Sequence, residues 1–245
     1  MSFLKQIFAG KSEPSEKQVA RAIKQVTQQH GEAATRVGAM ERLAEWKTPE
    51  AAAALLRRFT IQVPQASMDH EEKQYAVRLL VQMGQVAVEP ILQYLRTEPE
   101  VTWPVRSLRE LLPPAEYSLA LLNTLNQLAG QYTRWPEAKK VLLEHIPEDS
   151  FVQVKETIVH FLEDEDDDVC IAAVDYLARN GEEDVREQLI ETFLSAEARP
   201  RVRGRILDHF VDREWPVKGF RKKVEDALQM PFYLTAKGTV KRREL

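Results

Sequence analysis

The sequence predicts an all-α fold, an α-solenoid in which about six helical hairpins follow an N-terminal cap helix. Apolar residues recur at spacings of three and four through most of the 245-residue chain, as they do in amphipathic helices. They are grouped into pairs of short helices that return every roughly 30 to 40 residues, the period range of helical repeats. A single short pair buries little apolar surface, so we expect neighbouring pairs to cover one another.

The clearest pair occupies residues 168–194. In its first helix, Val169, Ala172 and Tyr176 fall on one face, and further apolar residues between them widen that face beyond a single stripe. Gly181 marks a tight turn, and the second helix offers one apolar stripe in return. The first helix therefore needs apolar neighbours on more than one side, which favours a stack of similar pairs.

The same pattern divides the rest of the chain. A cap helix is expected from Ser15 to Gln28, because serine can cap a first helical turn. Six pairs then begin near residues 33, 71, 103, 135, 168 and 199. Beyond residue 230 the helical pattern stops. The predicted organisation is a flexible segment (1–14), a helical array (15–230) and a basic tail or small hairpin (231–245).

The repeated pattern is Asp-x-Val-(Arg)-x-x-Ala-x-x-x-Leu-x-x-x-Gly, followed by a polar turn and Leu-Ile. It is clearest at 168–194 and 71–97, and it resembles the short bacterial HEAT-type repeat, of the kind also found in phycobilin lyase subunits. Cys170 replaces the family's first-helix arginine in the clearest repeat. Four basic residues match that arginine elsewhere: Arg36, Lys73, Arg106 and Arg203. The resemblance implies the fold and leaves the function open, since such repeats occur in scaffolds, adaptors, transport receptors and a few enzymes.

Charge is unevenly distributed along the chain. The net charge is −4, yet residues 1–198 carry 21 basic and 32 acidic side chains, whereas residues 199–245 carry 13 basic and 6 acidic ones. The acidic excess is concentrated in residues 144–191, which hold 16 acidic and 3 basic side chains. The two ends therefore differ in sign, and the acidic block is expected to repel a polyanion laid along the array.

Motifs for catalysis, metal binding or cofactor binding are lacking. The acidic run 163–168 has neither the alternating ligands nor the central glycine of a calcium loop, and we expect a solvated turn in which Asp168 caps the next helix. The five histidines lie in different repeats, and Cys170 is expected to be a buried thiol. The sequence therefore predicts a protein that is not an enzyme, with no catalytic residue, no cofactor and no metal.

Tryptophan precedes proline three times, at Trp103, Trp135 and Trp215. Proline suits the first position of a helix, where its missing N–H would be unpaired anyway, and a tryptophan before it can fold over the first turn as a hydrophobic staple. The alternative is an exposed aromatic ridge, because tryptophan is enriched in binding hot spots. The staple is the favoured interpretation.

The favoured function is a non-enzymatic scaffold or adaptor that binds a protein or peptide on a concave surface lined by the second helix of each pair. The charges expected on that surface are mixed in sign, which suits a charged protein better than a uniform polyanion. They belong to Arg57, Arg58, Glu89, Arg96, Glu116, Lys155, Glu156, Arg186, Glu187 and Lys218.

Two alternatives stand beside this hypothesis. The first is a nucleic-acid-binding module that uses basic residues of the last pair, which is the less favoured partner because the body of the chain is acidic. These residues are Arg201, Arg203, Arg205, Arg221, Lys222 and Lys223. The second is an accessory subunit of a bilin lyase-type enzyme, which rests on the repeat resemblance alone.

The chain contains no run of about 20 apolar residues that would span a membrane, and no secretory signal pattern. The sequence therefore predicts a cytoplasmic protein. The opening segment carries apolar residues on one helical face, typical of a loosely docked terminus or of a weak contact with a membrane or a protein. These residues are Phe3, Leu4, Ile7 and Phe8.

Overall fold

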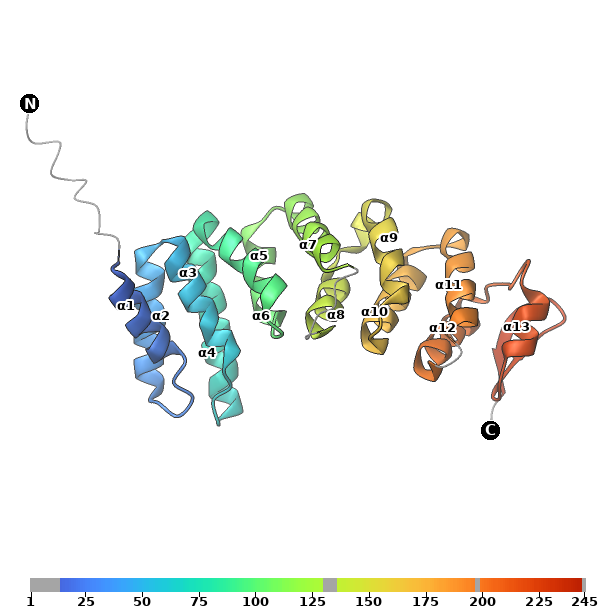
Figure 1. The fold of residues 1–245 in the computed structure, drawn as a ribbon, viewed down its shortest axis with the longest axis horizontal. Coiled ribbons are helices and arrows are strands. Elements are labelled where there is room, and N and C mark those ends of the chain that lie inside the picture. Colours follow the sequence, from blue (N-terminus) through green and yellow to red (C-terminus); the bar gives the residue numbers. More distant parts are fainter. Residues whose placement is uncertain (1–13, 130–135, 197–198, 244–245) are drawn as a thin grey trace, which may run out of the picture. The chain divides into compact units, whose positions relative to one another are not determined.

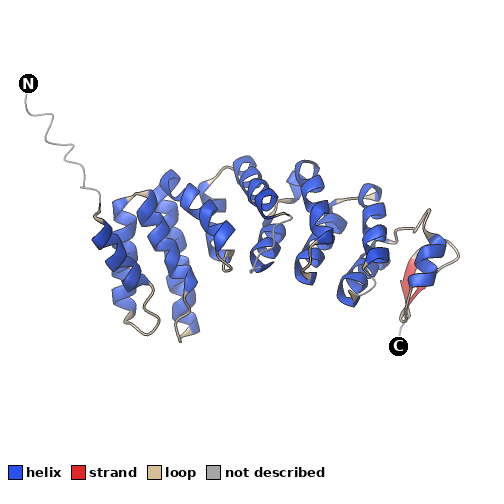
Figure 2. Ribbon diagram, viewed as in Figure 1, coloured by secondary structure: helices blue, strands red, loops and turns tan. Residues whose placement is uncertain are grey.

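The computed structural model describes residues 14–129, 136–196 and 199–243, and this part of the chain is mostly helical (Figures 1 and 2). It divides into two compact units, Met1–Ala120 and Leu121–Leu245, called here the first and the second unit. The all-α fold predicted from the sequence is confirmed, and the helices pack mainly on their neighbours in the chain.

Two sets of helices alternate along the first unit (Figure 1). Helices α2, α4 and α6 pack in series, while α1, α3 and α5 pack in series and against the first set. The bounds are α1 Glu16–Val26, α2 Ala33–Trp46, α3 Pro49–Leu56, α4 Ala66–Met83, α5 Val88–Thr97 and α6 Thr102–Leu111. Short 3-10 turns follow α3 and α4, at Arg57–Thr60 and Gly84–Ala87. Helix α7, Pro114–Leu128, contains the division between the units.

The second unit repeats this alternation. Helix α10 packs on both α8 and α12, while α11 contacts α10, α12 and α13. The bounds are α8 Pro136–His145, α9 Phe151–His160, α10 Asp167–Asn180, α11 Glu183–Ser195, α12 Pro200–Arg213 and α13 Arg221–Ala227, with 3-10 turns at Glu148–Ser150 and Phe161–Glu163. Strands β1 Phe232–Leu234 and β2 Val240–Arg242 form an antiparallel hairpin in register Phe232 with Arg242. Of the two alternatives for the tail, the structure has the hairpin.

The helical pairs predicted from apolar spacing are present, from α2 and α3 to α12 and α13, and α1 precedes them. The residues that defined the clearest pair form its core: Val169 and Leu177 are fully buried and Tyr176 is 2% exposed. Cys170 is buried as predicted, and burial raises the pKa of its thiol to about 11. Helical periodicity therefore identified the buried faces correctly.

The helix starts agree with the sequence in one case and differ in another. Thr48 caps α3, accepting a hydrogen bond from the Ala51 N–H at 3.2 Å, with proline at the first helical position as expected. The prediction that Asp168 caps α10 was wrong. The helix begins at Asp167, so the cap is Asp166, whose Oδ1 accepts the N–H groups of Asp168 and Val169 at 2.9 and 3.1 Å.

The return helix of the last pair is shorter than its apolar spacing predicted. The apolar residues Val217, Phe220, Val224 and Leu228 predict a helix that already includes Val217. Helix α13 instead begins at Arg221, and Val217 donates its N–H to the Gly238 carbonyl at 2.8 Å. Pro216, which has no N–H to donate, forms an isolated antiparallel bridge with Thr239 of the hairpin. The chain before α13 is therefore held by the tail hairpin, an interaction that helical periodicity does not register.

The staple interpretation of the Trp-Pro pairs is wrong for the two tryptophans that the structure describes, while Trp135 lies outside the described residues. Trp103 stands inside the first turn of α6, which begins at Thr102. Trp215 precedes no helix start and packs edge-on against Phe210, with ring centroids 5.7 Å apart.

The apolar N-terminal residues Phe3 to Phe8 also lie outside the described part of the chain. None of the described helices is long and apolar enough to cross a bilayer.

Candidate binding groove between α4 and α6

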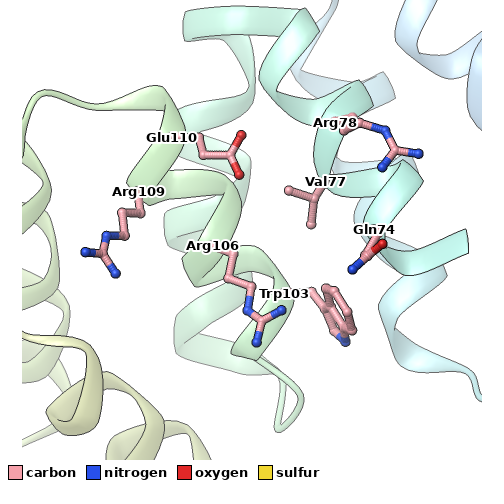
Figure 3. A pocket seen from close by; sticks show the side chains of 7 residues that line it. All are labelled: Gln74, Val77, Arg78, Trp103, Arg106, Arg109 and Glu110. Atoms are coloured by element: carbon pink, nitrogen blue, oxygen red, sulfur yellow. The ribbon is translucent and has the colours of Figure 1, made fainter. Parts of the chain in front are cut away.

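A groove of about 350 Å³ lies between α4 and α6 in the first unit (Figure 3). Both helices belong to the set formed by the first helix of each pair. Three of the lining residues are arginines, one is an aromatic and one is an acid. The full lining is Gln74, Val77, Arg78, Trp103, Arg106, Arg109 and Glu110.

The base of the groove combines an aromatic ring with a cation. Trp103 is partly exposed, and the Arg106 guanidinium lies over its ring, 4.9 Å from the centroid. The Trp103 ring also meets His70 of α4 edge-on at 5.1 Å. Val77 faces it from α4 (Figure 3) and is 6% exposed. These contacts fix the indole in a partly apolar, partly cationic setting.

Two further arginines stand on opposite sides of the groove, Arg78 on α4 and Arg109 on α6 (Figure 3). The Arg78 guanidinium lies 5.3 Å above the ring of Tyr75. Arg78, Arg106 and Arg109 form no ion pair anywhere in the part of the chain that the structure describes. With Glu110 as the acidic lining residue, the groove carries an excess of positive charge.

Other basic residues at the repeat's arginine position behave differently. Arg36 is 1% exposed and holds Glu72 of α4 with two hydrogen bonds, from Nε at 2.8 Å and from Nη2 at 2.7 Å. Lys73 is 8% exposed and pairs with Asp69 at 2.8 Å. Arg106 matches them in the sequence pattern, yet it is exposed and lies over a tryptophan. Arg203, the fourth residue at this position, lies over the ring of Phe193 at 4.5 Å, so Arg106 and Arg203 contact an aromatic ring where Arg36 and Lys73 pair with a carboxylate.

The expected protein-binding residues do not gather into one recessed surface in the first unit. Arg58 and Arg186 were expected to be exposed, and this was wrong. Arg58 is fully buried because Asp69 and Glu72 enclose it, at 2.8 and 3.0 Å. Arg57 pairs with Glu98 at 2.8 Å.

The remaining members of that set lie on several elements. Glu89 and Arg96 pair with each other on α5 at 3.2 Å. In the second unit Arg186 of α11 is 8% exposed and lies 3.5 Å from Glu183. Lys218 is exposed but precedes α13 and is not on a helix. Exposed or partly exposed positions on second helices are Glu116 of α7, Lys155 and Glu156 of α9, and Glu187 of α11.

Two of the four arginines named for nucleic acid pair with acidic residues of the neighbouring helix, and the other two donate to backbone carbonyls. Arg201 pairs with Asp168 of α10, and Arg205 Nη2 donates to Asp175 Oδ2 at 3.0 Å. Arg203 donates to the Ala227 carbonyl and lies over the ring of an adjacent phenylalanine. These side chains therefore hold α12 to its neighbours.

Arg221 of α13 is also engaged within the protein. Arg221 donates to the carbonyls of Ala236 and Thr235, at 3.0 and 3.2 Å, and so fastens the hairpin. Lys222 and Lys223 are exposed. These side chains therefore do not form a continuous basic face on the last pair.

A second cavity, about 170 Å³, lies in the second unit between α12 and the tail. It is mainly apolar, and its charged lining residue, Arg203, stacks on Phe193 at 4.5 Å. Its lining includes Gly204, Leu207, Met230 and Phe232.

The groove was not predicted from the sequence, because the sequence pattern indicates a structural role for each of its central residues. Trp103 was predicted to be a hydrophobic staple, and Arg106 matches the arginine position of the repeat. The signal that was available is the spacing of Trp103, Arg106 and Glu110, at i, i+3 and i+7, which places all three on one side of a helix.

Searching the described residues for groups of acidic, histidine or cysteine side chains that could hold a metal ion finds none. Comparisons of the chain with protein-family models, with curated proteins and with solved structures find no match. The groove between α4 and α6 is therefore the feature of the described residues that bears most directly on function.

Proposed function

We propose that this chain is a HEAT-type α-solenoid that acts in the cytoplasm as a non-enzymatic scaffold or adaptor and binds a segment of a partner protein. Support for the repeat architecture comes from packing in which helices two places apart follow one another in series within each unit. Support for the sequence resemblance comes from the buried basic side chains at the repeat's arginine position, Arg36 and Lys73.

The observation that carries the binding proposal is the groove between α4 and α6. Tryptophan and arginine are the residue types most enriched in the energetic centres of protein interfaces. Here Trp103 and Arg106 are stacked on each other at an accessible surface, with arginines on both sides. We therefore place the partner on the first helices of the pairs, and not on the second helices that the sequence suggested.

Capture of a partner from the source cell tests this proposal. We expect the full chain to recover a protein in stoichiometric amount, and the double variant Trp103→Ala/Arg106→Ala to lose it. The matched control is Glu89→Ala/Arg96→Ala, which removes an exposed pair from the second helix α5. Circular dichroism melting of each variant establishes that it is folded. Recovery of the same protein by the groove variant, with loss by the control, would place the partner on the second helices instead.

A further inference from the structure

We infer that the groove between α4 and α6 recognises an acidic peptide segment, with carboxylates held by the flanking arginines and an apolar side chain seated against Trp103 and Val77. This inference rests on the proposed function and names the chemistry of its ligand.

Several arginines that lie between neighbouring helices receive a carboxylate from the adjacent helix, as Arg199 does from Asp167 at 2.7 Å and Arg36 does from Glu72 at 2.7 Å. Such carboxylates are lacking for the groove arginines among the described residues. Arginine binds carboxylates with paired, charge-assisted hydrogen bonds, so a partner's acidic side chains can supply what the fold does not.

The size and lining of the groove suit a short peptide segment. A volume of about 350 Å³ is at the lower end of the roughly 300–1,000 Å³ range of ligand pockets, and it suits a few side chains of a short segment. Trp103 and the small exposed part of Val77 offer an apolar surface between the charged residues of α6, Arg106, Arg109 and Glu110, and Arg78 of α4 (Figure 3). An apolar side chain placed there excludes water and strengthens the surrounding ion pairs.

A single-stranded nucleic acid is the other kind of ligand that combines anionic groups with apolar surfaces. Binding a single strand needs open aromatic faces for stacking and a basic track that follows the backbone. In the groove Trp103 is the single aromatic residue among the described lining residues and Arg106 lies over one of its faces, so successive bases have no series of rings to stack on, and Glu110 would face a phosphate with like charge. Separate carboxylates, spaced by the peptide backbone, can avoid Glu110 where a continuous phosphate chain cannot. The observations therefore favour the acidic peptide.

Fluorescence anisotropy with defined probes tests this inference on the full chain. The probes are a short labelled peptide of alternating glutamate and leucine, the same peptide with lysine for glutamate, and an oligothymidine of matching length. We expect only the acidic peptide to bind at about 50 mM salt, and its affinity to fall as salt is raised. The double variant Arg78→Glu/Arg109→Glu should weaken binding by roughly tenfold or more.

The matched control is Lys17→Glu/Arg21→Glu, which makes the same change of charge at exposed positions of α1 in the same unit. We expect it to alter the affinity by less than about twofold. Equal binding of the lysine peptide, or equal losses in both double variants, would overturn the inference, and preferred binding of oligothymidine would replace the peptide with a nucleic acid. If a partner is captured through Trp103 while the acidic peptide does not bind, the ligand class is wrong and the proposed function stands.

Discussion

At the scale of single residues, two glycines that align in the repeat pattern are needed for different reasons. Gly84 follows α4 with a positive φ of 73°, a conformation that other residues adopt only with strain. Gly181 has an ordinary φ of −89°, but a Cβ there would lie 2.6 Å from Val185 Cγ1 and 2.9 Å from the Leu177 carbonyl oxygen. The sequence predicted a turn at both positions and could not tell which constraint applies, since crowding depends on the next helix.

Gly204, in contrast, is required neither by a positive φ nor by crowding, and its replacement provides a prediction. It lies in the interior of α12, where glycine is unfavourable, and an added Cβ would have no neighbour within 4 Å. We expect Gly204→Ala to raise the free energy of unfolding by about 0.5–1 kcal/mol, because alanine loses less backbone entropy on folding. Urea unfolding followed by circular dichroism measures the change.

The paired substitution Gly181→Ala serves as the contrast. There the new methyl group would clash with the start of α11, so we expect the free energy of unfolding to fall by roughly 1–3 kcal/mol. A loss of stability in Gly204→Ala, or no loss in Gly181→Ala, would show that the packing around these positions differs from that described.

At the scale of helices, neighbouring pairs are joined by polar contacts between residues about one repeat apart. Arg36 and Glu72 are 36 residues apart, Glu41 and Tyr75 are 34 apart, and Asp168 and Arg201 are 33 apart. Each of these contacts joins first helices, α2 to α4 or α10 to α12. The helices themselves could be predicted from local spacing, whereas these partners could not, because they depend on the relative register of two helices.

Arg58 shows the consequence for site prediction. A single sequence gives no sign that this arginine is buried, and its charge suggested an exposed position on a second helix. Its burial depends on Asp69 and Glu72, which α4 brings to it from 11 and 14 residues further along the chain. The groove escaped prediction for a related reason, since α4 and α6 each contribute only part of it.

The buried ion cluster around Glu72 yields a prediction at this scale. Glu72 accepts hydrogen bonds from both Arg36 and Arg58, and all three side chains are at most 5% exposed. The bond to Glu72 raises the pKa of Arg36 although burial opposes this. We expect Glu72→Gln to lower the free energy of unfolding by roughly 3–5 kcal/mol, because two buried cations would lose a shared counterion.

An exposed ion pair of the same unit provides the comparison. Glu89 has a side chain that is 78% exposed and pairs with Arg96. We expect Glu89→Gln to change the free energy of unfolding by no more than about 0.5 kcal/mol in the same urea titration. Similar effects of the two substitutions would mean that the cluster around Glu72 contributes no more than a surface pair.

At the scale of the whole molecule, the uneven charge seen in the sequence is partly neutralised by ion pairs between helices that pack together. The acidic block of residues 144–191 includes all of α10, the basic end begins at Arg199 directly before α12, and these two helices lie against each other in the second unit. Asp167, Asp168 and Asp175 meet Arg199, Arg201 and Arg205 across that junction. Opposite charges that look like two separate surfaces in the sequence therefore neutralise one another along one interface, which leaves fewer arginines available to an external polyanion.

Carboxylates held in this way make the stability of the molecule depend on pH. Asp69 in the first unit and Asp175 in the second are buried enough for burial to raise their pKa values, yet hydrogen bonds from basic neighbours outweigh that effect and both pKa values are lowered. For Asp175 the donors are His209 at 2.7 Å and Arg205. A carboxyl group whose pKa is lower in the folded state stabilises the fold above its unfolded pKa of about 3.9, and loses that contribution as pH falls through the folded value.

We therefore expect the free energy of unfolding to decline as pH falls below about 4, and Asp175→Asn to remove part of that decline. The asparagine cannot carry charge, so the variant should already be less stable at pH 7, by about 1–3 kcal/mol, since Arg205 and His209 lose a charged acceptor. Urea unfolding at a series of pH values from 7 downward measures both effects. Curves for variant and native chain that stay parallel throughout the acid range would mean that Asp175 keeps an ordinary pKa in the folded chain, and that its contacts with Arg205 and His209 do not make the stability depend on pH.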